Sequence, residues 1–200
     1  MTRETITLPP GSWLHPEGQR VSGLPESEQG FLAKRLLGLT RRRAASATNL
    51  NVFTVLARLG GIFLPYLLFL SQLLMKGRIP RVDKELIILR VAWRIGCVYE
   101  WGHHYEMARE LGLGANEILS VAKPDNPEWD ERLRALLHAT DELLAARAIS
   151  GGTWQTLRKY LSEDQAVEFC MLVGHYIMVA GTINSTGVAL EPGYLKDTDR

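Results

Sequence analysis

The spacing of apolar residues predicts helices along nearly the whole chain. After a proline- and glycine-rich start over residues 1–25, apolar residues recur at intervals of three and four. This spacing predicts helices over residues 27–43, 49–59, 62–76, 115–121, 131–148, 153–160 and 162–184, and helical structure from 83 to 111. No segment sustains the alternation typical of a strand. We therefore predict an all-α fold with an irregular N-terminal arm (1–25) and one domain (26–200).

Turn and capping residues mark several boundaries. The glycine pair at 60–61 is expected to break one helix, and the pair at 151–152 another. Thr153 then has the form of an N-cap. Ser162 followed by Gln165 has the form of a capping box, and Gly187 is suited to end the last helix.

Composition narrows the function classes. The chain has 200 residues with a net charge of +1, which gives no basic excess for nucleic acid. Its start lacks the apolar stretch of a signal peptide, and it has only two cysteines, so we expect a cytoplasmic protein.

The most apolar segment, residues 60–75, carries no charge. It is shorter than the ~20 residues of a membrane span and contains Pro65. We expect a buried or subunit-facing helix rather than a membrane helix, and hence a homo-oligomer.

Candidate chemistry is concentrated between residues 82 and 111, where ionisable and nucleophilic side chains interrupt an apolar, helix-forming stretch: Glu85, Cys97, Glu100, His103 and His104. A helix turns about 100° per residue. Cys97, Glu100 and His104 would then lie within about 60° of one another, whereas Glu85 would point about 120° away on a continuous helix. Alternatively, Gly96 ends the first helix, Cys97 begins a second, and Glu85 folds toward the others.

Such a break would place the thiol at a helix N-terminus, which favours the thiolate. His104 would accept the thiol proton, and Glu85 or Glu100 would orient the imidazole. An ionised Glu100 would oppose this, because a nearby negative charge raises the pKa of the thiol of Cys97.

Simpler interpretations stay open for each residue. Cys97 can be a small core residue, and Glu85 can complement the helix dipole. Glu100 can pair with Arg94 or His104, and His103 is expected to leave the pocket. A metal site is not expected, because no second ligand cluster lies nearby in the sequence, and no cofactor motif is present.

The apolar C-terminal helix carries further polar residues. These are Cys170, His175, Tyr176 and Asn184. A histidine such as His175 is more often a hydrogen-bonded core residue than a catalytic one, and Cys170 is interpreted as a core residue.

The series Glu85, Cys97, position 100 and His104 resembles the E-x11-C-x2-C-x3-H motif of alkylhydroperoxidase D-like proteins, which belong with the carboxymuconolactone decarboxylases. Two later segments, DELLAARAISGGTWQTL and VGHYIMVAGTINSTGVAL, also resemble helices of longer members, so the likeness covers about residues 48–190. It implies an all-helical bundle assembled as a trimer or hexamer, with Cys97, His104 and Glu85 in the motif's roles. Position 100 departs from the motif, because it is Glu100 rather than a second cysteine.

Three functions follow from this combination. The first is a cysteine-based peroxide or thiol oxidoreductase in which Cys97 is resolved by an external thiol or by Cys170. The second is an acid–base decarboxylase or isomerase acting on a small organic acid or lactone through Glu85, Glu100 and His104. The third is a non-catalytic oligomer that binds a small apolar ligand. The sequence favours the first.

Overall fold

In the computed structural model, residues 6, 8–43, 50–192 and 194 are described. This part of the chain contains nine α-helices and one 3₁₀ segment: α1 (Phe31–Arg43), α2 (Asn51–Leu56), η1 (Ala57–Ile62), α3 (Phe63–Met75), α4 (Arg81–Ile95), α5 (Val98–Glu110), α6 (Ala115–Ser120), α7 (Glu131–Ala146), α8 (Gly151–Leu157) and α9 (Glu163–Thr186). This part of the chain contains no β-strand, so the predicted all-α fold is confirmed.

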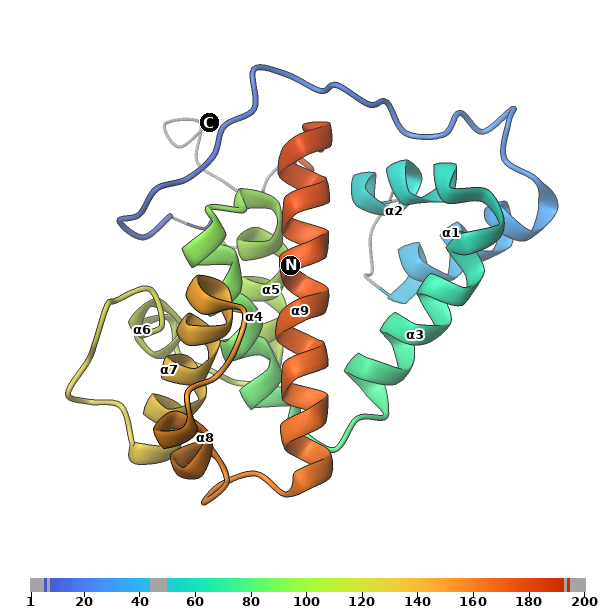
Figure 1. The fold of residues 1–200 in the computed structure, drawn as a ribbon. Coiled ribbons are helices and arrows are strands. Elements are labelled where there is room, and N and C mark those ends of the chain that lie inside the picture. Colours follow the sequence, from blue (N-terminus) through green and yellow to red (C-terminus); the bar gives the residue numbers. More distant parts are fainter. Residues whose placement is uncertain (1–5, 7, 44–49, 193, 195–200) are drawn as a thin grey trace.

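Helix α9 crosses the middle of the bundle, with α4, α5 and α7 on one side and α3 standing off on the other (Figure 1). The core has three apolar clusters: one joins α4, α5 and α6, one joins α2, α5 and α9, and one joins α4, α7 and α9. Residues 84–92 of α4 are all buried, so this helix is enclosed on every side. Any polar group on α4 must therefore find a partner inside the protein.

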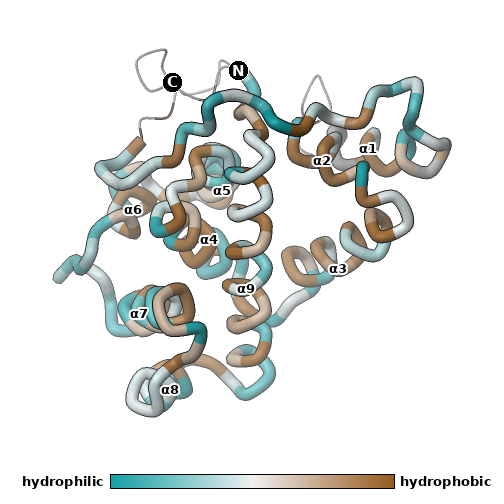
Figure 2. Tube along the Cα trace, turned by 45° about the horizontal axis from the view of Figure 1, so that its top comes forward, coloured by the Kyte–Doolittle hydropathy of each residue, from teal (hydrophilic) through white to brown (hydrophobic). Residues whose placement is uncertain are grey.

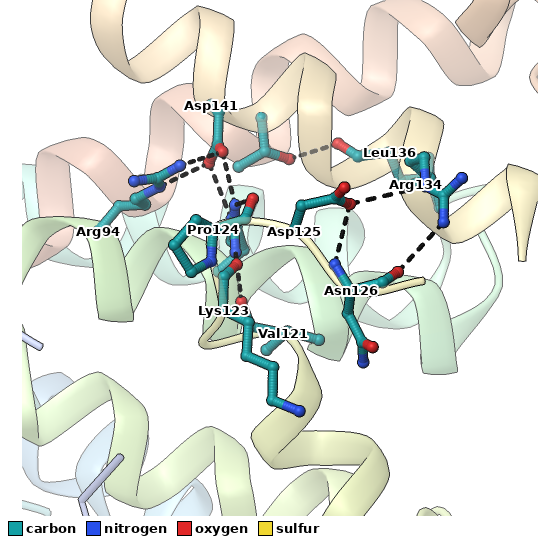
Figure 3. A network of polar contacts seen from close by, with 11 residues as sticks. Arg94, Val121, Lys123, Pro124, Asp125, Asn126, Arg134, Leu136 and Asp141 are labelled. Atoms are coloured by element: carbon teal, nitrogen blue, oxygen red, sulfur yellow. Dashed lines mark hydrogen bonds and ion pairs between the residues drawn. The ribbon is translucent and has the colours of Figure 1, made fainter. Parts of the chain in front are cut away.

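The charged residues of α4 do find such partners. Arg90 donates to both carboxylate oxygens of Asp141 at 2.8 and 2.6 Å, and to the carbonyl oxygen of Val121 at 2.6 Å. Arg94 donates to the same Asp141 carboxylate, and Figure 3 shows the two side chains facing each other above the loop of Lys123 and Pro124. The loop after α6 is thereby fixed against α4 and α7. At the other end of α4, Lys84 pairs with Glu168 of α9 at 2.8 Å.

The joint between α4 and α5 lies at Gly96. This residue has φ 73° and ψ 33°, which is the left-handed conformation that glycine adopts without strain. Cys97 donates its N–H to the carbonyl oxygen of Ala92 at 2.8 Å and is the N-cap residue of α5. The alternative with two helices is therefore the observed one, and the continuous helix is not.

The N-terminal arm crosses this joint. Leu14 donates its N–H to the carbonyl of Gly96 at 2.9 Å, and the ring of Trp13 packs edge-on to Trp101 at 5.6 Å. Trp93 donates to the carbonyl of Pro10 at 2.8 Å. The described part of the arm carries no helix before α1 and is nevertheless docked on the bundle (Figure 1). The domain boundary near residue 25 stays a prediction.

Several helix boundaries differ from the sequence interpretation. Thr153 is not an N-cap: Ser150 caps α8 by accepting from the N–H of Thr153 at 3.4 Å, so Gly151 and Gly152 lie in the first turn. Glu142 fixes this cap by accepting from the N–H of Ser150 at 2.7 Å, a contact from a different helix that local sequence cannot reveal. The first helix starts at Phe31 rather than at residue 27, whereas the breaks at 60–61 and 96 and the Ser162–Gln165 capping box are confirmed.

Two helical segments, Asn51–Met75 and Glu163–Thr186, are long and apolar enough to cross a membrane by length and composition alone. The first is interrupted by η1, where Gly60 has φ 58°, and the second is the central helix α9. Helix α9 is therefore a core helix, whereas only Phe63 and Leu73 of α3 are buried, so the expected buried position of residues 60–75 is not observed. The membrane-span interpretation has weak support. Apolar positions run along both α3 and α9 (Figure 2). Several of their large apolar side chains are exposed: Leu68, Phe69, Met75, Val167, Met171 and Met178.

The joint at Gly96 gives a stability prediction. A Cβ added there would sit 2.1 Å from the carbonyl oxygen of Ser12 in an already strained conformation. Gly96→Ala should therefore lower the free energy of unfolding by at least about 1–2 kcal/mol in urea titrations. Gly174→Ala is the matched control, because its Cβ meets open space on α9 and should stabilise by about 0.5–1 kcal/mol. Equal effects of the two substitutions would contradict this account of the joint.

Candidate active site

The turn at Gly96 brings Glu85 of α4 and His104 of α5 into contact. The Oε2 atom of Glu85 lies 2.6 Å from Nδ1 of His104, and both side chains are buried. A carboxylate can only accept, so Nδ1 carries the hydrogen and the other ring nitrogen, Nε2, is left unprotonated in the neutral imidazole. This is the arrangement of an oriented base.

Glu100 lies one turn before His104 on α5 and is 3% exposed. Neither of its carboxyl oxygens has a hydrogen-bond partner in the described part of the chain. The alternative in which Glu100 pairs with Arg94 or His104 is therefore not observed: Arg94 binds Asp141 and His104 binds Glu85. Burial raises the pKa of Glu100 well above its ordinary value, because nothing compensates the charged form. The side chain is thus a carboxylic acid able to donate a proton.

Cys97 begins α5, as the two-helix alternative expected, and its side chain is fully buried. Burial, followed by the nearby Glu100, raises the pKa of this thiol well above its ordinary value. The N–H groups of Tyr99 and Glu100 act in the opposite direction but do not offset these effects. The helix N-terminus therefore does not produce the thiolate that we expected. Cys97 and Cys170 are both free thiols, so no disulfide joins them.

Aromatic rings from α3 and α9 surround the imidazole of His175. His175 stacks against Tyr66 with ring centroids 5.6 Å apart and an interplanar angle of 24°, and it also contacts Phe69 at 5.5 Å. Tyr176 packs edge-on to both His175 and His104, at 5.2 and 5.0 Å. Through the contact of Tyr176 with His104, these rings join α5 to α3 and α9.

His175 is in the core, as expected, but it is not the hydrogen-bonded core residue that the sequence suggested. It is 5% exposed, and both ring nitrogens lack a partner among the described residues. Burial, with a smaller effect from His104, lowers its pKa to about 4, so the ring is neutral at pH 7. Tyr66 was missed entirely, because it is one aromatic residue in an apolar helix and its position opposite His175 depends on the fold.

His103 points away from this cluster, as its position on the helix predicts. Its Nε2 lies 2.7 Å from Glu191, and Tyr194 lies 2.9 Å from its Nδ1. Glu191 also accepts from the hydroxyl of Tyr99 at 2.7 Å. Although burial acts to raise the pKa of Glu191, the contacts with His103 and the others hold it below its ordinary value. This second network ties the segment after α9 to α5.

In the described ranges, no three His, Cys, Asp or Glu side chains gather in a way that could hold a metal ion. The expectation that no metal and no cofactor are needed stays a prediction.

A surface groove of about 340 Å³ lies between α3 and α9, lined by Phe69, Gln72, Leu73, Lys76, Gly77, Arg78, Asp164, Glu168 and Met171. It does not include Cys97, Glu100 or His104. Phe69 connects it with the buried cluster, because the same ring lines the groove and contacts His175.

The state of Glu100 gives a prediction of pH dependence. A carboxyl group whose pKa is raised on folding contributes stability that is fully present below its ordinary pKa of 4.5 and is lost as the pH rises toward the folded value. The unfolding free energy of the wild type relative to Glu100→Gln should fall by about 1.4 kcal/mol per pH unit across this window. Urea titrations between pH 4 and 8 measure this difference. A difference independent of pH would show that Glu100 is not held as the acid.

Comparisons with known proteins agree with this architecture. The sequence pattern described as the carboxymuconolactone decarboxylase family matches residues 65–142. A search of curated protein sequences finds no significant match.

Several solved structures share the fold. An uncharacterized peroxidase-related protein from Silicibacter sp. TM1040 is 15% identical with a TM-score of 0.73, over 94% of this chain and 97% of that one. A peroxidase-related protein from Ralstonia eutropha JMP134, described as an alkylhydroperoxidase AhpD core, is 18% identical with a TM-score of 0.75, over 87% and 93%. The debrominase Bmp8 is 15% identical with a TM-score of 0.72, over 86% and 92%. Identities this low establish a shared fold and leave the activity open.

The matched segment contains the joint at Gly96 and all four motif positions, Glu85, Cys97, Glu100 and His104. The helices around it follow the arrangement of the AhpD-like structures. The resemblance seen in the sequence is therefore confirmed: residues 65–142 match the carboxymuconolactone decarboxylase family, and the chain shares the fold of the alkylhydroperoxidase D-like structures.

Proposed function

We propose that this protein is a proton-transfer enzyme acting on a small lactone or enol, with His104 as the base, Glu85 orienting it, and Glu100 as the acid. The observation that carries the proposal is the Glu85–His104 contact at 2.6 Å on the same helices as an unpartnered, buried Glu100. One group is poised to accept a proton and the other to donate one, which is the division of roles that general acid–base catalysis requires.

An isomerisation shows how the protons balance. Nε2 of His104 removes a proton from the carbon next to a lactone carbonyl, and the electrons of that C–H bond shift the double bond into conjugation. The electrons of the original double bond take the proton of Glu100 at the carbon farther from the carbonyl, Cγ. Transfer of the proton from His104 to Glu100 then restores both groups, so no oxidant or reductant is consumed.

The geometry supports this function over cysteine chemistry, which the sequence alone favoured. A reactive cysteine needs the thiolate, and both the burial of Cys97 and the neighbouring Glu100 disfavour it. Cys97 and Cys170 are also not joined by a disulfide in the described structure.

A single-cysteine peroxidase is the second candidate, favoured by the place of Cys97 at the N-terminus of α5 and by the peroxidase-related names of two similar structures. In this reaction Cys97 attacks a hydroperoxide to give a sulfenic acid and an alcohol. Two equivalents of an external thiol then reduce it to the thiol, with release of water and a disulfide. This route requires the thiol to become uncovered.

The exposed apolar side chains of α3 and α9 support the further proposal that copies of this chain assemble, as a trimer or hexamer, in the cytoplasm. Leu68, Met171 and Met178 are each half exposed or more, which is unfavourable for a free monomer.

Assembly can be measured directly. Light scattering after size exclusion should give the mass of an oligomer for the wild type, and Met171→Glu with Met178→Glu should reduce it. Leu14→Glu, an equally exposed apolar residue on the arm, is the control and should leave the mass unchanged. A monomeric wild type would end this proposal.

The function is tested with a β,γ-unsaturated γ-lactone in D₂O, followed by NMR as double-bond migration and deuterium incorporation. Glu100→Gln keeps the shape of the acid but removes its proton, and should lower the rate about 10²- to 10⁴-fold. Cys97→Ala should keep it within a few-fold. Consumption of tert-butyl hydroperoxide with dithiothreitol is measured in parallel. Peroxide turnover lost in Cys97→Ala, without lactone turnover in the wild type, would favour the second candidate.

A further inference from the structure

The proposed reaction uses Glu85, Glu100 and His104 but assigns nothing to His175. This imidazole is buried on α9 with neither ring nitrogen hydrogen-bonded in the described part of the chain. Leaving such a group unpaired costs about 1–3 kcal/mol. A nonpolar residue would pack between Tyr66 and Tyr176 without this cost, so the imidazole is better explained by a ligand than by packing.

We infer that His175, Tyr66 and Phe69 form a binding site for a small, neutral, planar molecule that carries a hydroxyl group, entered from the groove between α3 and α9. The inference rests on the proposed function for the role of this molecule as substrate, while its binding can be measured without turnover.

The planar shape follows from the rings around His175. Tyr66 lies nearly parallel to the imidazole, and Tyr176 and Phe69 stand at 85° and 57° to it. A guest that took the place of the Phe69 ring against His175 would meet aromatic faces and edges at normal contact distance, which favours a flat guest over a branched aliphatic one.

The ring nitrogens of His175 indicate that the bound molecule is neutral and carries a hydroxyl group. A neutral imidazole offers one N–H donor and one acceptor, which a hydroxyl group can match with its own acceptor and donor. Among the described residues, three cations of α4 are unavailable to an anion, because Arg90 and Arg94 are bound to Asp141 and Lys84 to Glu168. Lys76 lines the groove, and His175 is not among the residues that line it.

The route follows from Phe69, which is 40% exposed in the groove and touches His175 on its inner side. A rotation of the Phe69 ring would therefore uncover the imidazole toward the groove. A guest seated there would lie in the aromatic cluster that also contacts His104 through Tyr176.

Phenol, toluene and benzoate at pH 7 are the probes, because they share a ring but differ in the hydroxyl group and the charge. Binding is followed by the ring ¹⁵N shifts of histidine-labelled protein, with His175 assigned from its loss in His175→Gln. Phenol should shift the His175 nitrogens and bind at least tenfold more tightly than toluene or benzoate. Unshifted His175 signals, or toluene binding equal to phenol, would overturn the inference.

Variants separate the roles. His175→Phe should lose the preference for phenol over toluene, whereas His175→Gln, with an amide donor and acceptor, should keep most of it. His15→Phe on the exposed arm is the matched control and should behave as wild type. Should His175→Phe not fold, the wild type and His175→Gln still decide: a preference absent from the folded His175→Gln counts against hydrogen bonding by this residue.

Glu100→Gln distinguishes this inference from the proposed function. Normal phenol binding with lactone turnover also intact would overturn the proposed function and leave the binding site standing. Loss of lactone turnover with no phenol effect on His175 in the wild type would overturn the binding site and leave the acid–base function standing.

Discussion

The left-handed turn at Gly96 is the constraint on which the site depends. Glu85 and His104 are 19 positions apart, and on one straight helix they would be separated by about 28 Å along its axis. They touch because α4 ends at Gly96 and α5 starts afresh at Cys97, packed against it. The arm supports this turn from outside, since Leu14 bonds to the Gly96 carbonyl. The N-terminal arm, which has no helix here, thus stabilises the turn that brings Glu85 to His104.

Burial then determines the protonation state of the groups around this turn. Without compensating partners, a low-dielectric interior favours neutral forms, so Glu100 is an acid, Cys97 a thiol and His175 a neutral ring. The cations that might have offset this are committed elsewhere: Arg90 and Arg94 hold Asp141 and the loop after α6 (Figure 3). The result is a cluster suited to moving protons between neutral partners rather than to binding a charged substrate.

Much of this architecture could be predicted from the sequence because it depends on local signals. Apolar periodicity gave the helices, and Gly96 offered the turn that the site requires. The sequence could also place Cys97, Glu100 and His104 on one face, since that depends on helical geometry alone. It could not show that Glu100 lacks a partner, because Arg94 is withdrawn by Asp141 from another helix. Nor could it show Tyr66 beside His175, a contact between residues of α3 and α9 that only the packing creates.

Glutamate at position 100 is more than the loss of a second thiol, because it couples to Cys97. The two groups are one turn apart at the start of α5, and an ionised Glu100 raises the pKa of the Cys97 thiol beyond the effect of burial. A thiolate at Cys97 therefore requires Glu100 to keep its proton, while acid catalysis requires Glu100 to release it in the transition state. The two candidate chemistries thus place opposite demands on the same pair. Since Glu85 and His104 form a base that needs no thiolate, proton transfer can begin with Glu100 protonated and Cys97 as a thiol, whereas thiol chemistry must first create a thiolate in the interior.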